Sequence, residues 1–487
     1  MSKHRRPNIV VFLTDDHGQW ANGCYGNREV NTPSIDWLAA HGVRMQNAMT
    51  PTPVCSPARA TFWTGLYPSQ HGIHDYLAPA EYRDGPWIEG ETQLGEILAG
   101  EGYRCGFFGK WHCGTPEETR PGFEEWFSIG RRTGPHRGEQ TYTHNGEPYT
   151  EIGYQARITT DAAIRFLARV TGPPDGGAAP AASERGTGGA SDGRAPFFAF
   201  VGLVSTHSPY ADHPPRLVDA YRDAALVDIP RERVHPFGRV TGEGKNAAHQ
   251  AWRERQAQYY ASVSEIDEQL GRVIDLLDER GELENTLIVY TADHGLNVGH
   301  HGLFGKGNAT RPLNMLEESI RIPMVFGGWS GLFGHQVRRE FVDHADLFQT
   351  LAAAAGAEVG GPASPADEPA RAYPGRSFLP MLTEARAIAD WKDVQTGEYG
   401  DLRMARSASL KLIRRHGRGA DQLFDLERDP RETRNVIDEP GYEPHVERLD
   451  EALDAYFGPM AGSPKSGLRV TELRSHNPVE AWRGEQS

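Results

Sequence analysis

The sequence predicts an α/β fold with a mostly parallel sheet, helices on both faces, and a smaller antiparallel sheet near the C-terminus. Apolar, β-branched runs without alternation, such as Asn8–Thr14 and Leu287–Thr291, are typical of strands buried on both faces. Amphipathic helix patterns separate these runs, and such alternation favours a parallel sheet. After Leu382 the pattern changes to short alternating stretches, for example Leu410–Arg414, which indicate antiparallel strands.

We therefore expect a large N-terminal domain over residues 1–382 and a smaller α+β domain over residues 383–487. A chain of 487 residues is long enough to bury a large core. Two stretches, about 171–195 and about 356–374, are rich in Gly, Ala and Pro, and we expect flexible surface segments there. The first is an insertion, because a strand pattern resumes at Pro196.

The net charge and the apolar content indicate which kinds of partner are disfavoured. The chain has 51 Lys and Arg against 66 Asp and Glu, a formal net charge of −15, which argues against broad nucleic-acid binding. No apolar run reaches the length of a membrane span, and we expect no membrane partner. The apolar run Ile9–Leu13 is shorter than the core of a signal peptide, so we expect a cytoplasmic location.

The four cysteines, Cys24, Cys55, Cys105 and Cys113, are too few to suggest a disulfide framework. A bridge between Cys105 and Cys113 is possible, but nothing in the pattern indicates it.

The first strand pattern ends at Asp15 and Asp16. Ligands of open α/β sheets bind outside the carboxyl ends of strands, so these acids are candidates for a cation site. Adjacent carboxylates repel each other unless a cation or water separates them. Taken alone, a solvated turn would be the simpler interpretation.

A helix follows over about 32–42, and a second begins near Cys55. Ser56 is a predicted helix cap, Pro57 suits the first helical position, and Gly65 can end the helix. Cys55 would then lie just outside a helix N-terminus, where the helix dipole favours negative charge, and Arg59 can project back beside it. The plainer alternative is a buried cysteine beside an ordinary capped helix.

The next elements bring more candidate residues to strand ends. A short helix over Thr92–Leu98 leads into a strand through Tyr103 and Phe107, which is followed by Lys110 and His112. In an extended chain these two side chains point to one face. A helix pattern from Thr160 and a strand over 196–201 come next, and His207 follows that strand.

The longest helix pattern covers about Ala248–Arg280, with an apolar stripe that faces the core. The buried strand after it delivers Asp293 and His294 to its carboxyl end, as the first strand does for its two acids. A glycine-rich loop then carries His300, His301 and Lys306, and the two histidines are not assigned a function. A strand over Pro323–Phe326 and a helix through Leu347–Leu351 complete the large domain.

Several of these strings resemble the motifs of the type I sulfatases, in family order and over most of the chain. Cys55–Arg59 followed by Thr64-Gly65 resembles the family signature Cys-x-Pro-x-Arg with a later Thr-Gly pair. Gly109–Gly114 resembles the second motif, with Cys113 where the family usually has an apolar residue. The loops of His207 and Lys306 resemble family loops, and the stretch 423–435 resembles a C-terminal motif. The resemblance implies an alkaline-phosphatase-like fold.

The resemblance also implies a cofactor set. In the family, the signature cysteine is converted to formylglycine by a formylglycine-generating enzyme, which would be a maturation partner acting on Cys55. One divalent cation would be held by Asp15, Asp16, Asp293 and His294 together with position 55. Oxygen-rich ligands suit Ca²⁺ first, and Mg²⁺ or Mn²⁺ next.

Catalytic roles follow by the same resemblance. Hydrated formylglycine at position 55 would attack sulfur and give a covalent sulfated enzyme. Arg59 and Lys110 would stabilise the nucleophile, and Lys306 and His207 would contact the sulfate, one of them protonating the leaving oxygen. His112 would then take a proton, so that the aldehyde reforms and sulfate leaves.

Three functions are open at this point. The first is a sulfatase acting on a small-molecule, aryl or saccharide sulfate ester. The second is a phosphonate monoester or phosphodiester hydrolase, because the same site suits tetrahedral phosphorus. The third is a non-catalytic binding protein with unmodified Cys55, which is disfavoured because every catalytic position is filled.

Overall fold

The computed structural model describes residues 6–130, 134–172, 194–230, 232–233, 235–238, 249–360, 372–384 and 386–483. The two stretches expected to be flexible, about 171–195 and about 356–374, lie largely outside the described residues. Within these ranges, no helix is both long and apolar enough to cross a bilayer. Cys24, Cys55, Cys105 and Cys113 are all free, so the Cys105–Cys113 bridge does not form.

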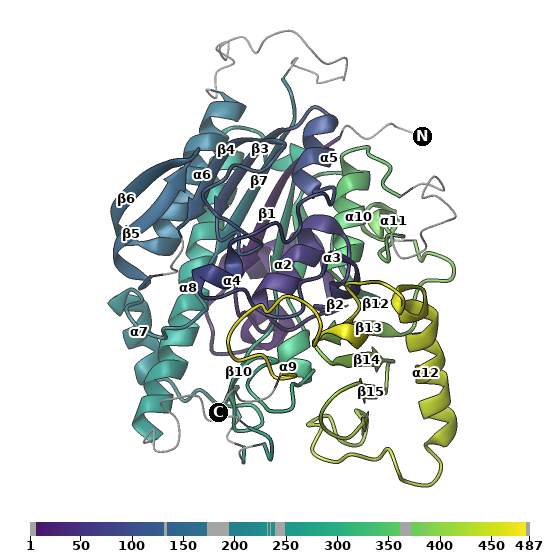
Figure 1. Cartoon of the computed structure of the whole chain (residues 1–487). Coiled ribbons are helices and arrows are strands. Elements are labelled where there is room, and N and C mark those ends of the chain that lie inside the picture. Colours follow the sequence, from purple (N-terminus) through teal and green to yellow (C-terminus); the bar gives the residue numbers. More distant parts are fainter. Residues whose placement is uncertain are drawn as a thin grey trace.

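A ten-stranded sheet forms the centre of the described structure (Figure 1). Its strands are β1 (Asn8–Thr14), β2 (Val43–Ala48), β3 (Arg104–Gly109), β4 (Phe123–Ile129), β5 (Arg137–His144), β6 (Glu147–Tyr154), β7 (Phe197–Leu203), β8 (Thr286–Ala292), β11 (Met324–Gly328) and β12 (Gln336–Val342). They lie in the order β12-β2-β11-β8-β1-β7-β3-β4-β5-β6. Neighbours from β8 to β4 are parallel, whereas β11 and β5 run antiparallel to both of their neighbours. The predicted mostly parallel sheet is confirmed.

Helices cover both faces of this sheet because its central strands are apolar on both sides. Ile9, Val11 and Leu13 of β1 belong to one core cluster, while Val10 and Phe12 belong to another. The first cluster includes side chains of α2 (Cys55–Thr64), α5 (Leu94–Gly100) and α10 (His344–Ala354). The second includes side chains of α1 (Pro33–His41), α6 (Gln155–Thr171) and α8 (His249–Glu279). Figure 1 shows α2 and α8 on opposite sides of β1.

The remaining short elements lie in the connections. They are α3 (Pro68–His71), α4 (Ala80–Arg83), α7 (Pro215–Arg222), α9 (Glu317–Ile320), α11 (Leu379–Thr383) and the two-residue strands β9 (Asn297–Val298) and β10 (Phe304–Gly305).

A four-stranded antiparallel sheet follows, as the alternating patterns predicted. It consists of β13 (Gln395–Tyr399), β14 (Leu402–Arg406), β15 (Leu410–Arg415) and β16 (Gln422–Asp425), paired in chain order. The helix α12 (Glu443–Phe457) packs its apolar face against it, since Leu449, Leu453 and Phe457 share a core cluster with Leu412. The chain between α11 and β13 connects the two sheets.

Candidate active site

Four neighbouring strands of the large sheet end at one edge, and residues of interest follow each of them. The strands are β8, β1, β7 and β3, adjacent in that order. Asp293 and His294 follow β8, Asp15 and Asp16 follow β1, His207 follows β7, and Lys110 follows β3. Parallel strands bring their carboxyl ends to the same edge of the sheet. The two acidic strand ends meet there, and Asp16 N donates a hydrogen bond to Asp293 Oδ1 at 3.2 Å.

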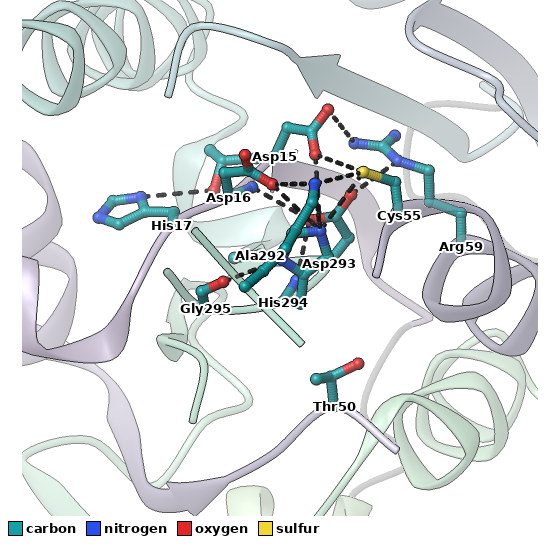
Figure 2. Close-up of polar contacts among 12 residues, drawn as sticks. Asp15, Asp16, His17, Thr50, Cys55, Arg59, Ala292, Asp293, His294 and Gly295 are labelled. Atoms are coloured by element: carbon teal, nitrogen blue, oxygen red, sulfur yellow. Dashed lines mark hydrogen bonds and ion pairs between the residues drawn. The ribbon is translucent and has the colours of Figure 1, made fainter. Parts of the chain in front are cut away.

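Cys55 is the first residue of α2, and its thiol lies against this edge. Its Sγ is 3.2 Å from Asp15 Oδ1, 3.0 Å from Lys306 Nζ and 3.4 Å from His294 Nε2. The side chain is 2% exposed. Figure 2 shows Sγ pointing from the start of the helix toward Asp15 and His294. The structure therefore brings the signature cysteine to the cluster of strand-end side chains.

The start of α2 differs from the prediction. Val54, in an extended conformation, is the N-cap, and the helix begins at Cys55 rather than after Ser56. Ser56 does not cap the helix, because its Oγ accepts a hydrogen bond from Leu77 N at 3.0 Å. Ser56 was expected to bond an amide of the first helical turn, and the amide of Leu77, 21 residues away, takes that place. Gly65 ends the helix as predicted, in the left-handed conformation with φ 70°.

Arg59 is fully buried, and it contacts the carboxylates around Cys55. Its Nε donates to Asp293 Oδ2 at 2.9 Å, and its Nη1 donates to the Lys110 carbonyl at 2.8 Å. Its Nη2 is 3.9 Å from Asp15 Oδ2. The guanidinium therefore fixes two acidic side chains and the end of β3 at once.

Two lysines complete the cationic side of the site. Lys110 Nζ forms an ion pair with Asp15 Oδ2. Lys306 Nζ lies 2.6 Å from Asp16 Oδ1, in addition to its contact with Cys55 Sγ. Both lysines are almost completely buried, at 4% and 9% exposed, so water screens their charges weakly.

These cations stabilise negative charge in the site. Burial by itself raises the pKa of the Cys55 thiol, but Lys110, Lys306 and His294 outweigh it, and the pKa of Cys55 lies well below its usual range. Burial and Cys55 also raise the pKa of Asp15, yet Lys110, His207 and Arg59 hold it below its ordinary value. An anion at position 55 is therefore stabilised by its surroundings.

The residues at the strand ends fit a divalent cation. Asp15, Asp16, Cys55 and His294 each offer a ligand atom, and these atoms lie within 4.8 Å of one another. Asp293 Oδ1 is 3.4 Å from His294 Nε2. His294 Nδ1 donates to the Gly295 carbonyl at 2.9 Å, which leaves Nε2 facing the carboxylates as a ligand. A cluster of oxygens with one oriented imidazole is the donor set of a hard or borderline metal ion.

Metal binding should depend on pH through His294. Burial by itself lowers the pKa of its imidazole, but Asp293 and the other nearby anions raise it to about 9. Burial and Asp15 raise the pKa of Asp293 to about 7. A metal must displace the proton on His294, so between pH 7 and 9 its apparent affinity should rise with pH, by up to about tenfold per unit.

The variant His294→Asn should retain metal, show a flatter dependence in this window, and favour Ca²⁺ over Mn²⁺. Titration of the metal-free protein with each ion at several pH values measures both effects. Superimposable curves for the two proteins would exclude His294 as a ligand.

The site shifts the pKa values of two histidines in opposite directions. Burial lowers the pKa of His112 to about 4 and Lys110 contributes, so this imidazole is neutral. Its Nε2 donates to the Leu77 carbonyl at 3.1 Å, which leaves Nδ1 as the unprotonated nitrogen of the ring, and a side-chain hydrogen bond links the ring to Cys55. The half-buried His207 is different: burial lowers its pKa, but Asp16 and Asp15 raise it above its ordinary value. His112 thus suits a proton acceptor, and His207 a proton donor.

A cavity of about 540 Å³ opens beside Cys55. Lys110, His112, His207 and Lys306 line it on the side of the strand ends. Its other described walls are mostly apolar, with Leu77, Ala78, Pro79, Trp111, Pro116 and Ile129, and they also include the polar side chains of Tyr76, Arg83 and Asn308. A small ligand in this cavity can therefore contact position 55 and the side chains of these two lysines and two histidines.

The sequence did not indicate several residues that support the site. Thr206 Oγ1 donates to the Asp15 carbonyl, and Tyr259 OH donates to the Asp16 carbonyl at 3.2 Å. The one signal for Thr206 in the sequence was its place directly before the candidate residue His207. Tyr259 lies inside the pattern of α8 and carries no local signal, because its partner is more than 240 positions away.

Fold and site together define a hydrolase of the alkaline phosphatase superfamily, with a buried cysteine at a helix start and a cluster of potential metal ligands at the strand ends. The family model described as "Sulfatase" matches residues 7–357, and the one described as "N-sulphoglucosamine sulphohydrolase, C-terminal" matches residues 299–457. The chain belongs to the sulfatase family, whose members hydrolyse sulfate esters.

Individual relatives agree with this assignment. An N-acetylglucosamine-6-O-sulfatase of Bacteroides thetaiotaomicron is 25% identical, over 92% of this chain and 86% of the relative. A structure solved in complex with its substrate D-glucosamine-2-N,6-O-disulfate superposes with a TM-score of 0.76 at 22% identity, over 95% of this chain and 99% of the other. The phosphonate monoester hydrolase of Agrobacterium radiobacter shares the fold, with a TM-score of 0.70 at 20% identity, over 93% and 96% of the two chains.

Proposed function

We propose that this protein hydrolyses the sulfate ester of a small alcohol, using a formylglycine made from Cys55 and one divalent cation, Ca²⁺ before Mg²⁺ or Mn²⁺. The observation that carries the proposal is the placement of Cys55. It lies at the start of a helix, and its Sγ lies within 3.4 Å of Lys306 Nζ, Asp15 Oδ1 and His294 Nε2. Maturation would require a formylglycine-generating enzyme as a partner.

The cation would be held by Asp15, Asp16, Asp293 and His294 together with position 55. When bound, it supplies Lewis-acid polarisation of a sulfate oxygen and lowers the pKa of a coordinated hydroxyl. The formyl group, once hydrated, supplies the hydroxyl that attacks sulfur.

Arg59 and Lys110 hold this arrangement in place. Arg59 bridges Asp293 and the carbonyl of Lys110, and so fixes a ligand side chain relative to the end of β3. The Lys110 ammonium lies beside Asp15 and stabilises negative charge that develops at position 55. Neither side chain needs to move during the reaction, because both are already buried and paired.

Proton transfers would fall to the histidines. His207 lines the cavity, and its pKa is raised above the ordinary value by Asp16 and Asp15, which favours the protonated form that can protonate the leaving alcohol oxygen. Lys306 holds its proton tightly beside Asp16, so it serves to bind sulfate oxygens. His112 is neutral, its Nδ1 is unprotonated and the ring is hydrogen-bonded to Cys55, so it can accept the proton of the second hydroxyl at position 55 when sulfate is released.

The reaction class is tested with two substrates that share one leaving group. We expect kcat/KM for para-nitrophenyl sulfate to exceed that for para-nitrophenyl phenylphosphonate by about tenfold or more. Membership of the sulfatase family supports this order, although a phosphonate hydrolase shares the fold. Steady-state kinetics on protein coexpressed with a formylglycine-generating enzyme gives both constants. The reverse order would establish the phosphonate alternative.

The apolar walls of the cavity predict the chemistry of the alcohol. Ring hydroxyls placed against Leu77, Pro116 and Ile129 would lose water without gaining a partner from those side chains. We therefore expect cyclohexylmethyl sulfate to be hydrolysed about tenfold more efficiently than N-acetylglucosamine 6-O-sulfate. Both are primary alkyl esters on six-membered rings, so kcat/KM reports mainly the polarity of the ring. A preference for the sugar would assign the protein to saccharide esters.

A further inference from the structure

The last part of the described chain returns from the small sheet to the active site. Residues 463–483, here called the C-terminal segment, follow α12 and consist of loops and turns with one 3₁₀ helix, Gly467–Arg469. Figure 1 shows this segment, in yellow, crossing back over the large sheet domain. It contacts residues 72–87, here called the wall segment, which contribute Tyr76, Leu77, Ala78, Pro79, Ala80 and Arg83 to the cavity.

His476 makes the central contact between the two segments. It is fully buried, and its Nε2 accepts a hydrogen bond from His74 N at 3.0 Å. On the other side of the ring, Nδ1 lies 2.6 Å from Glu480 Oε1, so the carboxylate fixes the tautomer that leaves Nε2 as an acceptor. The ring also stacks on Trp87, with centroids 5.0 Å apart. The His476 carbonyl accepts from Ala78 N at 3.3 Å.

Neighbouring side chains extend this contact along the wall segment. Asn477 Nδ2 donates to the Tyr76 carbonyl at 3.1 Å. Arg474 Nη2 donates to the Asp84 carbonyl at 2.8 Å, and its guanidinium lies 4.9 Å from the centroid of the Trp87 ring. These bonds hold the backbone on both sides of Leu77, the residue between the anchors at 76 and 78.

Leu77 connects the wall segment to the catalytic side chains. Its carbonyl accepts the hydrogen bond from His112 Nε2, which sets the tautomer of that ring. Its amide donates to Ser56 Oγ, next to Cys55. A displacement of Leu77 would therefore rotate the base or release it, while the metal cluster at the strand ends would stay in place.

We propose that His476 is a positioning residue for the active site: it holds the wall segment so that the Leu77 carbonyl orients His112. This inference rests on the role proposed above for His112. Displacement of a reacting group by about 1 Å can cost up to about 100-fold in rate, so a remote contact of this kind is large enough to measure.

The test is a double-mutant cycle on the fully modified protein, with an aryl sulfate as substrate. His112→Ala should give a burst of phenol followed by slow sulfate release, because the base acts in the second stage. His476→Ala should lower kcat by about 10- to 100-fold with the same burst. In the His112→Ala background, His476→Ala should change kcat by less than about twofold, since the base is already absent.

Three further variants separate positioning from general destabilisation. His476→Gln retains an acceptor for His74 N and should recover part of kcat. Asn477→Ala removes one bond to the wall segment and should give a smaller burst, which provides a second measurement if His476→Ala folds poorly. Arg469→Ala is the matched control, because this exposed residue pairs only with Glu472 among the described contacts of its side chain, and it should leave kcat unchanged.

Additive losses in the cycle, or a loss in His476→Ala without a burst, would overturn this inference while leaving the proposed function intact. A wild-type protein without turnover on any sulfate ester would instead contradict the proposed function itself.

Discussion

Cys55→Ala is expected to abolish sulfate-ester hydrolysis, with a loss of about 10⁶-fold in kcat, because it removes the position that carries the nucleophile. The protein should stay folded. The packing of α2 comes from Phe62 and Trp63, which are fully buried in the sheet core, whereas Cys55 faces the polar cluster. Product release by protein made with a formylglycine-generating enzyme measures turnover, and circular dichroism checks the fold.

Mass spectrometry provides an independent readout of the same position. The peptide that contains Cys55 should have lost H₂S and gained one oxygen, the change that converts a thiol carbon into an aldehyde. Cys113→Ala is the matched control. Cys113 is also buried, 3.6 Å from the Ser56 carbonyl, but burial raises its pKa to about 12 and it does not line the cavity. This variant should keep both the modification and turnover. Full activity in Cys55→Ala would contradict the proposed mechanism.

Lys110→Met is expected to lower kcat by about 10²–10³-fold, the usual cost of removing one charge-stabilising donor from a dry site. The ammonium pairs with Asp15 and is the largest of the cationic influences that lower the pKa of Cys55. Methionine keeps most of the volume of the side chain, so the charge is the main change. Stability should also decrease, because Asp15 loses a buried partner.

Lys392→Met separates the two consequences. Lys392 also pairs with two buried carboxylates, 2.8 Å from Asp343 and 2.6 Å from Asp346, but it lies outside the cavity. It should lower the melting temperature while leaving kcat within a few-fold of wild type. The comparison is made by measuring kcat of Lys110→Met and Lys392→Met well below the melting temperatures of both variants. Equal kcat in both variants would show that the charge of Lys110 has no part in catalysis.

Much of the architecture was predictable because it depends on local patterns. The strand β1 has the bounds that were predicted, since six consecutive apolar or β-branched positions, Ile9 to Thr14, are typical of a strand buried on both faces. The stripe of apolar residues predicted α8, and the alternation of apolar and polar residues predicted β15, in the same way. The predicted boundary at residue 382 falls within α11 and stays a prediction, because Ile388 and Trp391 beyond it still pack against a core cluster of the large sheet.

Predictions that depended on a single local hydrogen bond were weaker. The predicted cap at Ser56 was wrong, because the side chain instead accepts a bond from Leu77 N. Arg59 was expected to lie beside Cys55, and it reaches past that residue to Asp293. A pattern of residue types indicates which groups can bond, but competing partners exist only after folding.

The sequence alone determined that buried strands alternate with helices, which residue types follow the strands, and the resemblance to the family; the order of the strands in the sheet came from the structure. The sequence also supplied the chemical inventory of the site, from Cys55 to Lys306. Only the tertiary structure decided how those residues affect one another: that the pKa of His112 is lowered while that of His207 is raised, and that the C-terminal segment contacts the wall segment on both sides of Leu77. The physical reason is that burial and charge act over a few ångströms of space, and the folded chain brings together residues as distant as His74 and His476.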